Sequence, residues 1–283
     1  MRSAFNNPVL IKELKLRFRS FKSFAGILFY LLVLSVFVFG FIFMSTNFTG
    51  SGFINPQQSV ILFGLLTYVQ MALILFITPG LTAGAISTER EKQTLNILLT
   101  SSQSSFQIIF GKMSSSIVFL LLLLIAGLPL YSLVFLFGGI SPGQLLIIFA
   151  FLIVTMLAIA SIGVMFSTLI RKTIISMITT YGAMLFLTGI TAFFFMIGIS
   201  TIENSPGSLP LKSPAPISHF WATINPIALM LTLISPETSD ALFELTKIHF
   251  PVWAGYLIFY IAITVICLFI SVKKLRVNMK KKK

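Results

Sequence analysis

Six long stretches of this sequence contain no Asp, Glu, Lys, Arg or His, and this feature constrains the fold more than any other. A helix needs about 20 predominantly apolar residues to cross the hydrocarbon core of a bilayer. The mean hydropathy of +1.01 is also far from that of a soluble globular chain. We therefore predict an all-α integral membrane protein with six transmembrane helices, at residues 24–44, 59–84, 116–137, 145–170, 173–199 and 252–272.

The basic residues predict the orientation of these helices. All but two of the 20 Lys and Arg residues fall in the N-terminal segment, the loop after the second span, the link between spans four and five, and the C-terminal tail. Because basic residues concentrate on cytoplasmic loops, both termini are expected in the cytoplasm and the protein in the plasma membrane. This distribution accounts for the net charge of +13, so nucleic acid is not an expected partner.

The N-terminal segment, residues 1–23, has the pattern of an amphipathic helix. On a helical wheel Leu10, Ile11, Leu14, Phe18 and Phe21 share one face, while the basic side chains point away. Such a helix lies on an anionic lipid surface. The alternative, an ordinary basic stretch beside the membrane, requires no helix. The basic tail at 273–283 is expected to hold the C-terminus at the same lipid surface.

Residues 200–251 are expected to form an external loop between spans five and six. Within it, residues 217–234 are apolar but short for a span, and Pro226 interrupts them. A seventh span would also place the lysine-rich tail outside. We therefore predict a re-entrant or interfacial pair of helices, with Trp221 and Trp253 in the headgroup zone.

Four consecutive charged residues, 89–92, stand between the second and third apolar runs. Thr88 and Glu91 match a capping box, which predicts that a helix begins there. Leu95, Leu98 and Leu99 then give this helix one apolar face. A helix of this kind over residues 89–99 is suited to docking on a partner. The alternative is a helix that only joins two spans at the lipid interface.

Several kinds of chemistry lack the residues that they need. Spans without ionisable side chains contain no proton relay, which disfavours a secondary carrier. The Gly111-Lys112 pair lacks the rest of a phosphate-binding loop, and His219 and His249 have no second ligand at metal-binding spacing. No nucleophile–base pair supports an integral-membrane enzyme. We therefore expect no catalytic residue, metal or cofactor in this chain. If the protein moves something uphill, the energy must come from another chain.

At this point the residues resemble a known family. Residues 78–112, TPGLTAGAISTEREKQTLNILLTSSQSSFQIIFGK, are similar to the signature of the membrane subunits of ABC-2-type ABC transporters. NPVLIKELKLRFRS, residues 7–20, resembles the N-terminal elbow helix of that family, and NPIALM, residues 225–230, resembles its external Asn-Pro motif. The sequence departs from the pattern at Gln93 (usually Gly), Asn96 (commonly acidic) and Ser102 (often Pro).

The resemblance implies a single transmembrane domain over residues 1–283. It implies a permease that pairs with a second permease subunit, the same chain or a related one, and with cytoplasmic ABC ATPase subunits that bind ATP and Mg. Export is implied; the apolar spans suit an amphipathic or hydrophobic substrate such as a peptide, an antibiotic or a lipid-like molecule. The implied site residues are Glu89, Arg90, Glu91, Lys92, Thr94, Leu95, Leu98 and Leu99 in the coupling helix, Lys12, Glu13, Lys15, Arg17 and Arg19 in the elbow helix, and Trp221, Asn225 and Pro226 in the external loop.

One rival function shares these features. A non-transporting, ABC-like membrane anchor could hold an ATPase for signalling or resistance. Substrate flux in reconstituted vesicles would separate this scaffold from a permease. As a hypothesis for the permease, Glu89 and Glu91 make charged contacts with the ATPase or with the basic elbow helix.

Overall fold

The computed structural model describes residues 8–49, 55–95, 103–138, 140–203 and 216–280, and within these ranges it contains helices and no strand. The helices are α1 (Pro8–Phe18), α2 (Phe21–Thr49), α3 (Pro56–Thr82), α4 (Ser87–Glu91), α6 (Ser105–Ala126), α7 (Leu128–Phe137), α8 (Pro142–Leu169), α9 (Thr173–Leu185), the π-helical turn η2 (Phe186–Ile190), α10 (Thr191–Glu203), α11 (Pro216–Ile224), α12 (Pro226–Ile234), α13 (Pro236–Thr246) and α14 (Val252–Lys280).

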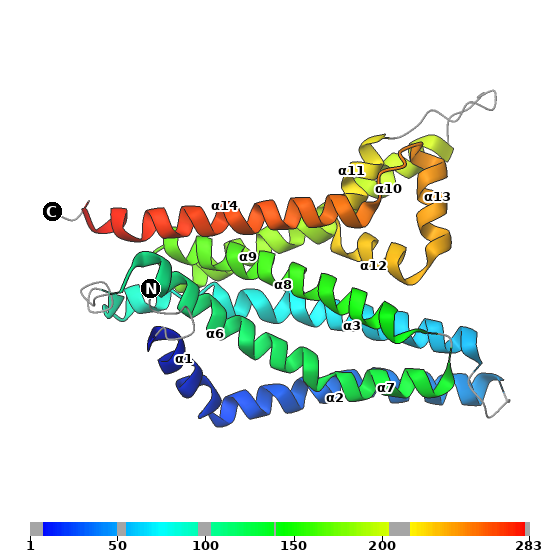
Figure 1. Cartoon of the computed structure of the whole chain (residues 1–283), viewed down its shortest axis with the longest axis horizontal. Helices are drawn as coiled ribbons and strands as arrows, with labels where there is room; N and C mark the ends of the chain where they lie inside the picture. Colours follow the sequence, from blue (N-terminus) through cyan, green and yellow to red (C-terminus); the bar gives the residue numbers. More distant parts are fainter. Residues whose placement is uncertain (1–7, 50–54, 96–102, 139, 204–215, 281–283) are drawn as a thin grey trace.

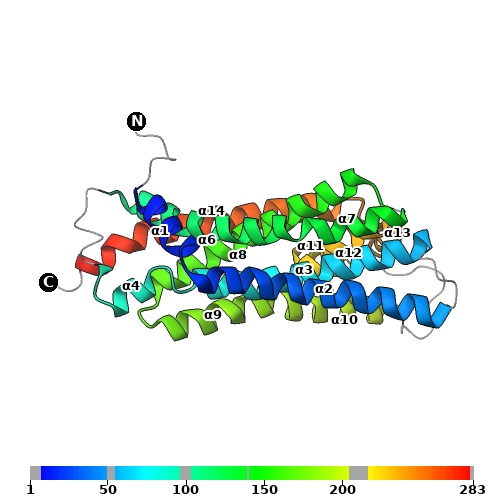
Figure 2. The ribbon, with the colours of Figure 1, turned by 90° about the horizontal axis from the view of Figure 1, so that it is seen from below.

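The long helices form an elongated bundle, in which α2, α3, α8, α9 and α14 run along the long axis (Figures 1 and 2). The short helices α1 and α4 lie at one end, together with the C-terminal end of α14. The helices α11, α12 and α13 lie at the opposite end. The bundle therefore has two distinct ends, and both terminal helices reach the same one.

The prediction of an all-helical chain with six spans is confirmed by length and composition. In the part of the chain that the structure describes, six helical stretches are long and apolar enough to cross a membrane: Ser23–Ser45, Pro56–Glu91, Ser105–Phe137, Pro142–Leu169, Thr173–Gly198 and Val252–Leu275. The third stretch begins eleven residues before the predicted start at 116, because Lys112 is accommodated inside the helix α6 by two carboxylates.

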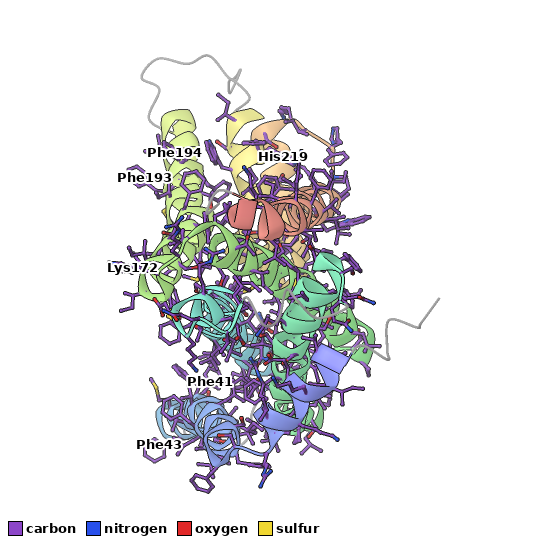
Figure 3. The ribbon with its side chains drawn as sticks, turned by 90° about the vertical axis from the view of Figure 1, so that its left-hand side faces the viewer. Phe41, Phe43, Lys172, Phe193, Phe194 and His219 are labelled. Carbon is purple, nitrogen blue, oxygen red and sulfur yellow. The ribbon has the colours of Figure 1, made fainter. Side chains whose placement is uncertain are left out.

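The fourth span, α8, is the most buried of the six and packs against α3, α6, α9 and α14. Small residues allow this close packing: a Cβ atom on Gly163 would collide with the Thr82 side chain of α3. In contrast, α2 and the span formed by α9, η2 and α10 are mostly exposed in the isolated chain. Seen from the end that holds α1, Phe43 and Phe193 lie at the periphery of the bundle (Figure 3). Such apolar surfaces suit contact with lipid or another membrane subunit.

The predicted extent of the N-terminal helix was wrong. The helix α1 ends at Phe18, and Phe21 is instead the first residue of α2, where its side chain is 83% exposed. Ile11 is exposed as well, whereas Val9 is buried and Phe18 packs beside Phe119 of α6. The single apolar face that the wheel predicted is therefore divided, because the chain changes direction at Arg19-Ser20.

Residues 217–234 form two helices that meet at an angle of 92°. Pro226 is the first residue of α12, and the break falls at Asn225, as the sequence predicts for an interrupted segment. A third helix, α13, follows and was not predicted. Its signal is nonetheless present, since Pro236 and Glu237 in the first turn both favour a helix start.

Candidate functional site

The helix α4 differs from the predicted coupling helix in its start and its length. It begins at Ser87, with Ile86 as the N-cap residue, and so the predicted Thr88–Glu91 capping box does not form. It ends at Glu91, because Gln93 adopts a left-handed backbone conformation with φ of 59°. The prediction of one continuous helix over residues 89–99 is therefore wrong. Leu95 is buried in the main core, and Leu98 and Leu99 lie outside the described residues.

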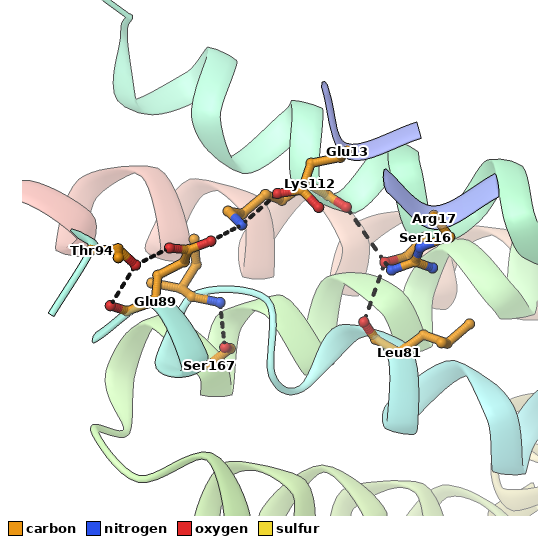
Figure 4. A network of polar contacts seen from close by, with 9 residues as sticks. Glu13, Arg17, Leu81, Glu89, Thr94, Lys112, Ser116 and Ser167 are labelled. Carbon is orange, nitrogen blue, oxygen red and sulfur yellow. Dashed lines mark hydrogen bonds and ion pairs between the residues drawn. The ribbon is translucent and has the colours of Figure 1, made fainter. Parts of the chain in front are cut away.

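Lys112 joins α4 to α1 through two ion pairs (Figure 4). Its Nζ lies 2.9 Å from Glu13 Oε1 on α1 and 2.9 Å from Glu89 Oε1 on α4. The lysine side chain is 7% exposed, and the two carboxylates are 27% and 30% exposed. Thr94 donates a hydrogen bond to the second carboxylate oxygen of Glu89. Because a buried charge is tolerated when it is paired and hydrogen-bonded, this cluster places a lysine inside an apolar helix.

Arg17 extends the same cluster along the seam between α1 and α6. Its Nη2 donates to Ser116 Oγ at 3.2 Å, and its guanidinium lies 5.7 Å from the centre of the Phe119 ring. Ser116 Oγ in turn donates to the carbonyl oxygen of Leu81 at 3.3 Å, which connects the seam to α3. Burial lowers the pKa of Arg17, and the nearby Glu13 carboxylate opposes this shift. An arginine nevertheless remains charged in a protein, so the seam contains a permanent cation.

The start of α4 is attached to the end of α8. Ser167 Oγ accepts hydrogen bonds from the backbone N–H groups of Ile86 and Ser87, at 2.8 and 2.9 Å. Arg90 donates to the carbonyl oxygens of Thr168 and Ile170, at 3.0 and 3.4 Å. These carbonyls lie at the C-terminal end of α8, where a cation is favourable. The side chain of Arg90 therefore holds α4 against α8.

Glu91 attaches the other side of α4 to α9. Its Oε1 accepts from the backbone N–H of Thr173 at 2.8 Å, and its Oε2 accepts from the Thr173 hydroxyl at 2.8 Å. Thr173 is the first residue of α9, where backbone N–H groups lack partners and a negative charge is favourable. The carboxylate that was predicted to cap its own helix thus caps the fifth span.

Together these contacts direct three of the four consecutive charges back into the bundle. Glu89 reaches α6, Arg90 reaches α8 and Glu91 reaches α9, while Lys92 is exposed. Glu89 is linked to the elbow helix only indirectly, through Lys112, which also pairs with the acidic Glu13 of α1, and Glu91 is bound to Thr173. A charged contact of either carboxylate with the ATPase stays a prediction. Lys12 and Lys15 on α1, and Arg19 directly after it, are exposed. We call the group Glu13, Arg17, Glu89, Arg90, Glu91, Lys112, Ser116, Ser167 and Thr173 the α4 cluster.

The predicted residues of the external loop lie at the opposite end of the bundle and are not part of this cluster. Trp221 stacks on Phe194 of α10 at 4.9 Å. Asn225 is buried and Pro226 starts α12. Within the described ranges, no group of three or more His, Cys, Asp or Glu residues could hold a metal ion.

Four residues of the α4 cluster were missed by the sequence reasoning as site residues: Lys112, Ser116, Ser167 and Thr173. A signal for Lys112 existed, because it is the one charged residue in the 33-residue apolar stretch Ser105–Phe137. No comparable signal marks Ser116, Ser167 or Thr173, since serine and threonine are frequent in all of these spans. Their roles depend on which helix ends meet in space.

Comparison with known proteins identifies the family of this chain. A family model described as "ABC-2 family transporter protein" matches residues 53–273, a range that contains α3, α4, Lys112 and the helices α11, α12 and α13. No curated protein matches the chain. The match covers most of the sequence and agrees with the resemblance of residues 78–112. The chain therefore belongs to the ABC-2 family of transporter proteins, and it is a multi-pass membrane permease of an ABC transporter.

Proposed function

We propose that this permease exports an amphipathic or hydrophobic substrate, and that a separate cytoplasmic ATPase drives it through α4. A second permease subunit, identical or related, completes the pathway. ATP and Mg bind to the ATPase and not to this chain. In this proposal α1, α4 and both termini face the cytoplasm, which the concentration of basic residues at that end supports.

The attachment of α4 to three other helices, α6, α8 and α9, carries the proposal. A short helix of five residues has little stability of its own, because helix nucleation is unfavourable. Here it is held by one ion pair to α6 and by hydrogen bonds to α8 and α9. A force on α4 is therefore transmitted to the ends of spans three, four and five. A loosely attached helix would instead move without displacing these spans.

The second link of the mechanism is the pairing of α4 with α1. Because Lys112 is shared by Glu13 and Glu89, displacement of either helix breaks an ion pair that is mostly shielded from water. Such a break leaves an uncompensated charge and is costly. The two helices are therefore expected to move together with α6. The substrate class is supported by the apolar, uncharged character of the spans.

The test is ATP-driven transport by the full chain with its own ATPase. The tagged permease is purified from its native membrane with the ATP-hydrolysing subunit bound and reconstituted into vesicles of phosphatidylethanolamine and phosphatidylglycerol. Movement of a fluorescent acyl-labelled phospholipid between leaflets is measured with and without ATP. We expect Glu89→Gln to lose most ATP-dependent movement while the ATPase stays bound and hydrolyses ATP.

Glu237→Gln is the matched control, because it makes the same change on α13 at the opposite end of the bundle. It should transport as the wild type does. Equal transport by the two variants would contradict the role of the α4 cluster. If the wild-type complex hydrolyses ATP and moves no labelled lipid, the export proposal for a lipid-like substrate fails and the scaffold function is favoured.

A further inference from the structure

The fifth span contains a π-helical turn, η2, between α9 and α10. In this turn the backbone N–H of Thr191 donates to the carbonyl oxygens of Phe186, five residues earlier, and of Thr188, three residues earlier, and not to the residue four earlier as in an α-helix. A π-helical turn therefore contains one residue more than the α-helical turn it replaces. Such turns are rare in proteins, and those that occur are often found at functional sites. Something outside the helix must compensate for its less favourable geometry.

Asn225 supplies that compensation from the break between α11 and α12. Its Nδ2 donates to the carbonyl oxygen of Thr188, inside η2, at 2.7 Å and to Thr191 Oγ1 at 2.8 Å. Its Oδ1 accepts from the N–H groups of Ile227 and Ala228, at 2.8 and 3.0 Å. Asn225 is 1% exposed, so both ends of one amide are used in a site shielded from bulk water.

The helices around Asn225 are held by their own contacts. On α11, Ser218 packs so closely on Gly198 of α10 that a Cβ atom there would collide with it, and Trp221 stacks on Phe194. Gln144 of α8 donates to the carbonyl oxygen of Leu233 at 3.2 Å and so holds α12. The corner at Asn225 is consequently fixed on both sides, and it can act as a rigid support for the π-helical turn.

We propose that Asn225 is a positioning residue that sets the helical register of the fifth span. With its amide in place, η2 is π-helical, and Thr191, Phe195 and Gly198 face the bundle. Without that amide, the turn relaxes to an α-helix and α10 rotates by one residue, about 100°. Rotation carries Phe195 out of the core and changes the face that α10 presents at the outer end. The use of this rotation for opening the outer end rests on the proposed permease function.

The first test measures register directly and needs no ATPase. A cysteine replaces Phe195, which packs against the core, in the full-length chain with Cys267→Ser, and its reaction with a small methanethiosulfonate is followed in lipid nanodiscs. Asn225→Asp keeps the acceptor that caps α12 but removes the donor to Thr188. We expect Asn225→Asp to raise the labelling rate several-fold. An unchanged labelling rate would overturn the proposal, because Asn225 would then act only as the N-cap of α12.

Tyr260→Phe is the matched control for this corner. It removes the hydrogen bond from Tyr260 to the carbonyl oxygen of Ile224, at 3.0 Å, without touching η2. Labelling of position 195 should stay at the wild-type rate, and an increase equal to that of Asn225→Asp would overturn the proposal. If Asn225→Asp does not fold, Thr191→Val removes one of the two acceptors instead, and it must raise labelling for the proposal to stand.

Single-residue deletions give a second test, which distinguishes control of the helical register by Asn225 from a merely structural role. Gly189 lies in η2 and Gly182 in α9, and an added Cβ atom at either would meet nothing within 4 Å. Deleting Gly189 should convert η2 to an α-helix, leave position 195 protected and preserve the fold even with Asn225→Asp. Deleting Gly182 should expose position 195, because the register of everything after it shifts. Equal labelling of the two deletions would overturn the proposal.

Transport separates this inference from the proposed function. The Gly189 deletion removes the second register, so it should fold, bind the ATPase and lose ATP-dependent lipid movement in the vesicle assay. Wild-type movement by this deletion would show that a change of register is not used for opening. Absence of movement in the wild type would count against the permease function alone, while the labelling results would still decide the role of Asn225.

Discussion

Glu91 accepts two hydrogen bonds from Thr173, one from the backbone N–H and one from the hydroxyl, both at 2.8 Å. The two residues are 82 positions apart in the chain, yet they form the kind of cap that usually joins residues within one turn. The last residue of α4 therefore caps the first turn of α9. This contact links the charged loop to the fifth span, which also carries the π-helical turn.

Removing this cap should loosen the first turn of α9 without unfolding the bundle. Glu91→Ala leaves the N–H of Thr173 to water, because the site is exposed. We expect faster hydrogen exchange at residues 173–176 and an unchanged melting temperature within about 2 °C. Glu237→Ala at the other end serves as the control. Equal exchange rates at residues 173–176 in the two variants would contradict the capping role.

Replacing Lys112 by methionine should be more damaging than replacing it by arginine. Lys112→Met leaves Glu13 and Glu89 near each other without the cation between them. Removing one partner of a fully buried ion pair costs about 3–5 kcal/mol, and the partial exposure of both carboxylates reduces this to about 2 kcal/mol. The free energy of unfolding is measured by denaturant titration in detergent.

The carboxylates provide the control for that change. If repulsion between them is the cause, Glu13→Gln should recover part of the loss when combined with Lys112→Met. A double variant that is less stable than Lys112→Met would contradict the ion-pair explanation. Lys112→Arg keeps the positive charge, so its free energy of unfolding should fall by less than that of Lys112→Met.

Much of the fold could be predicted because the evidence for it is local. Each apolar run is long enough to span a membrane whatever it packs against, and Pro226 ends one helix and starts another through its own geometry. The α4 cluster could be predicted only in part. Lys112 and Glu13 are 99 residues apart, and Ser167 and Ser87 are 80 apart. Their contacts depend on which helix ends meet, and no local pattern contains that information.

Ser167→Ala should weaken the attachment of the start of α4 to α8. The serine hydroxyl accepts from two backbone N–H groups, on Ile86 and Ser87, and both residues are fully buried. An unsatisfied buried donor costs about 1–3 kcal/mol, so we expect a loss in that range in the free energy of unfolding. Ser132→Ala, at an exposed serine that bonds within its own helix, should change stability by less than about 0.5 kcal/mol. Equal losses would contradict the role of Ser167.

Gln93→Gly should stabilise the protein, although it removes a side chain. Gln93 has φ of 59°, and left-handed backbone costs a non-glycine residue about 1 kcal/mol. The side chain is exposed, so little packing is lost, and glycine adopts this conformation without strain. The gain is reduced by the greater freedom of glycine in the unfolded chain, so a rise of about 0.5 kcal/mol is expected.

Lys247→Gly is the parallel change at the left-handed residue that follows α13, and it should have the same sign. Gln93→Ala keeps the strain and should not stabilise. Thermal unfolding of the three variants in one detergent compares them directly. A stability gain from alanine equal to that from glycine would show that the glutamine side chain, and not the backbone conformation, is unfavourable at this turn. With that outcome, backbone conformation would not explain why the ABC-2 family usually has glycine at the position of Gln93.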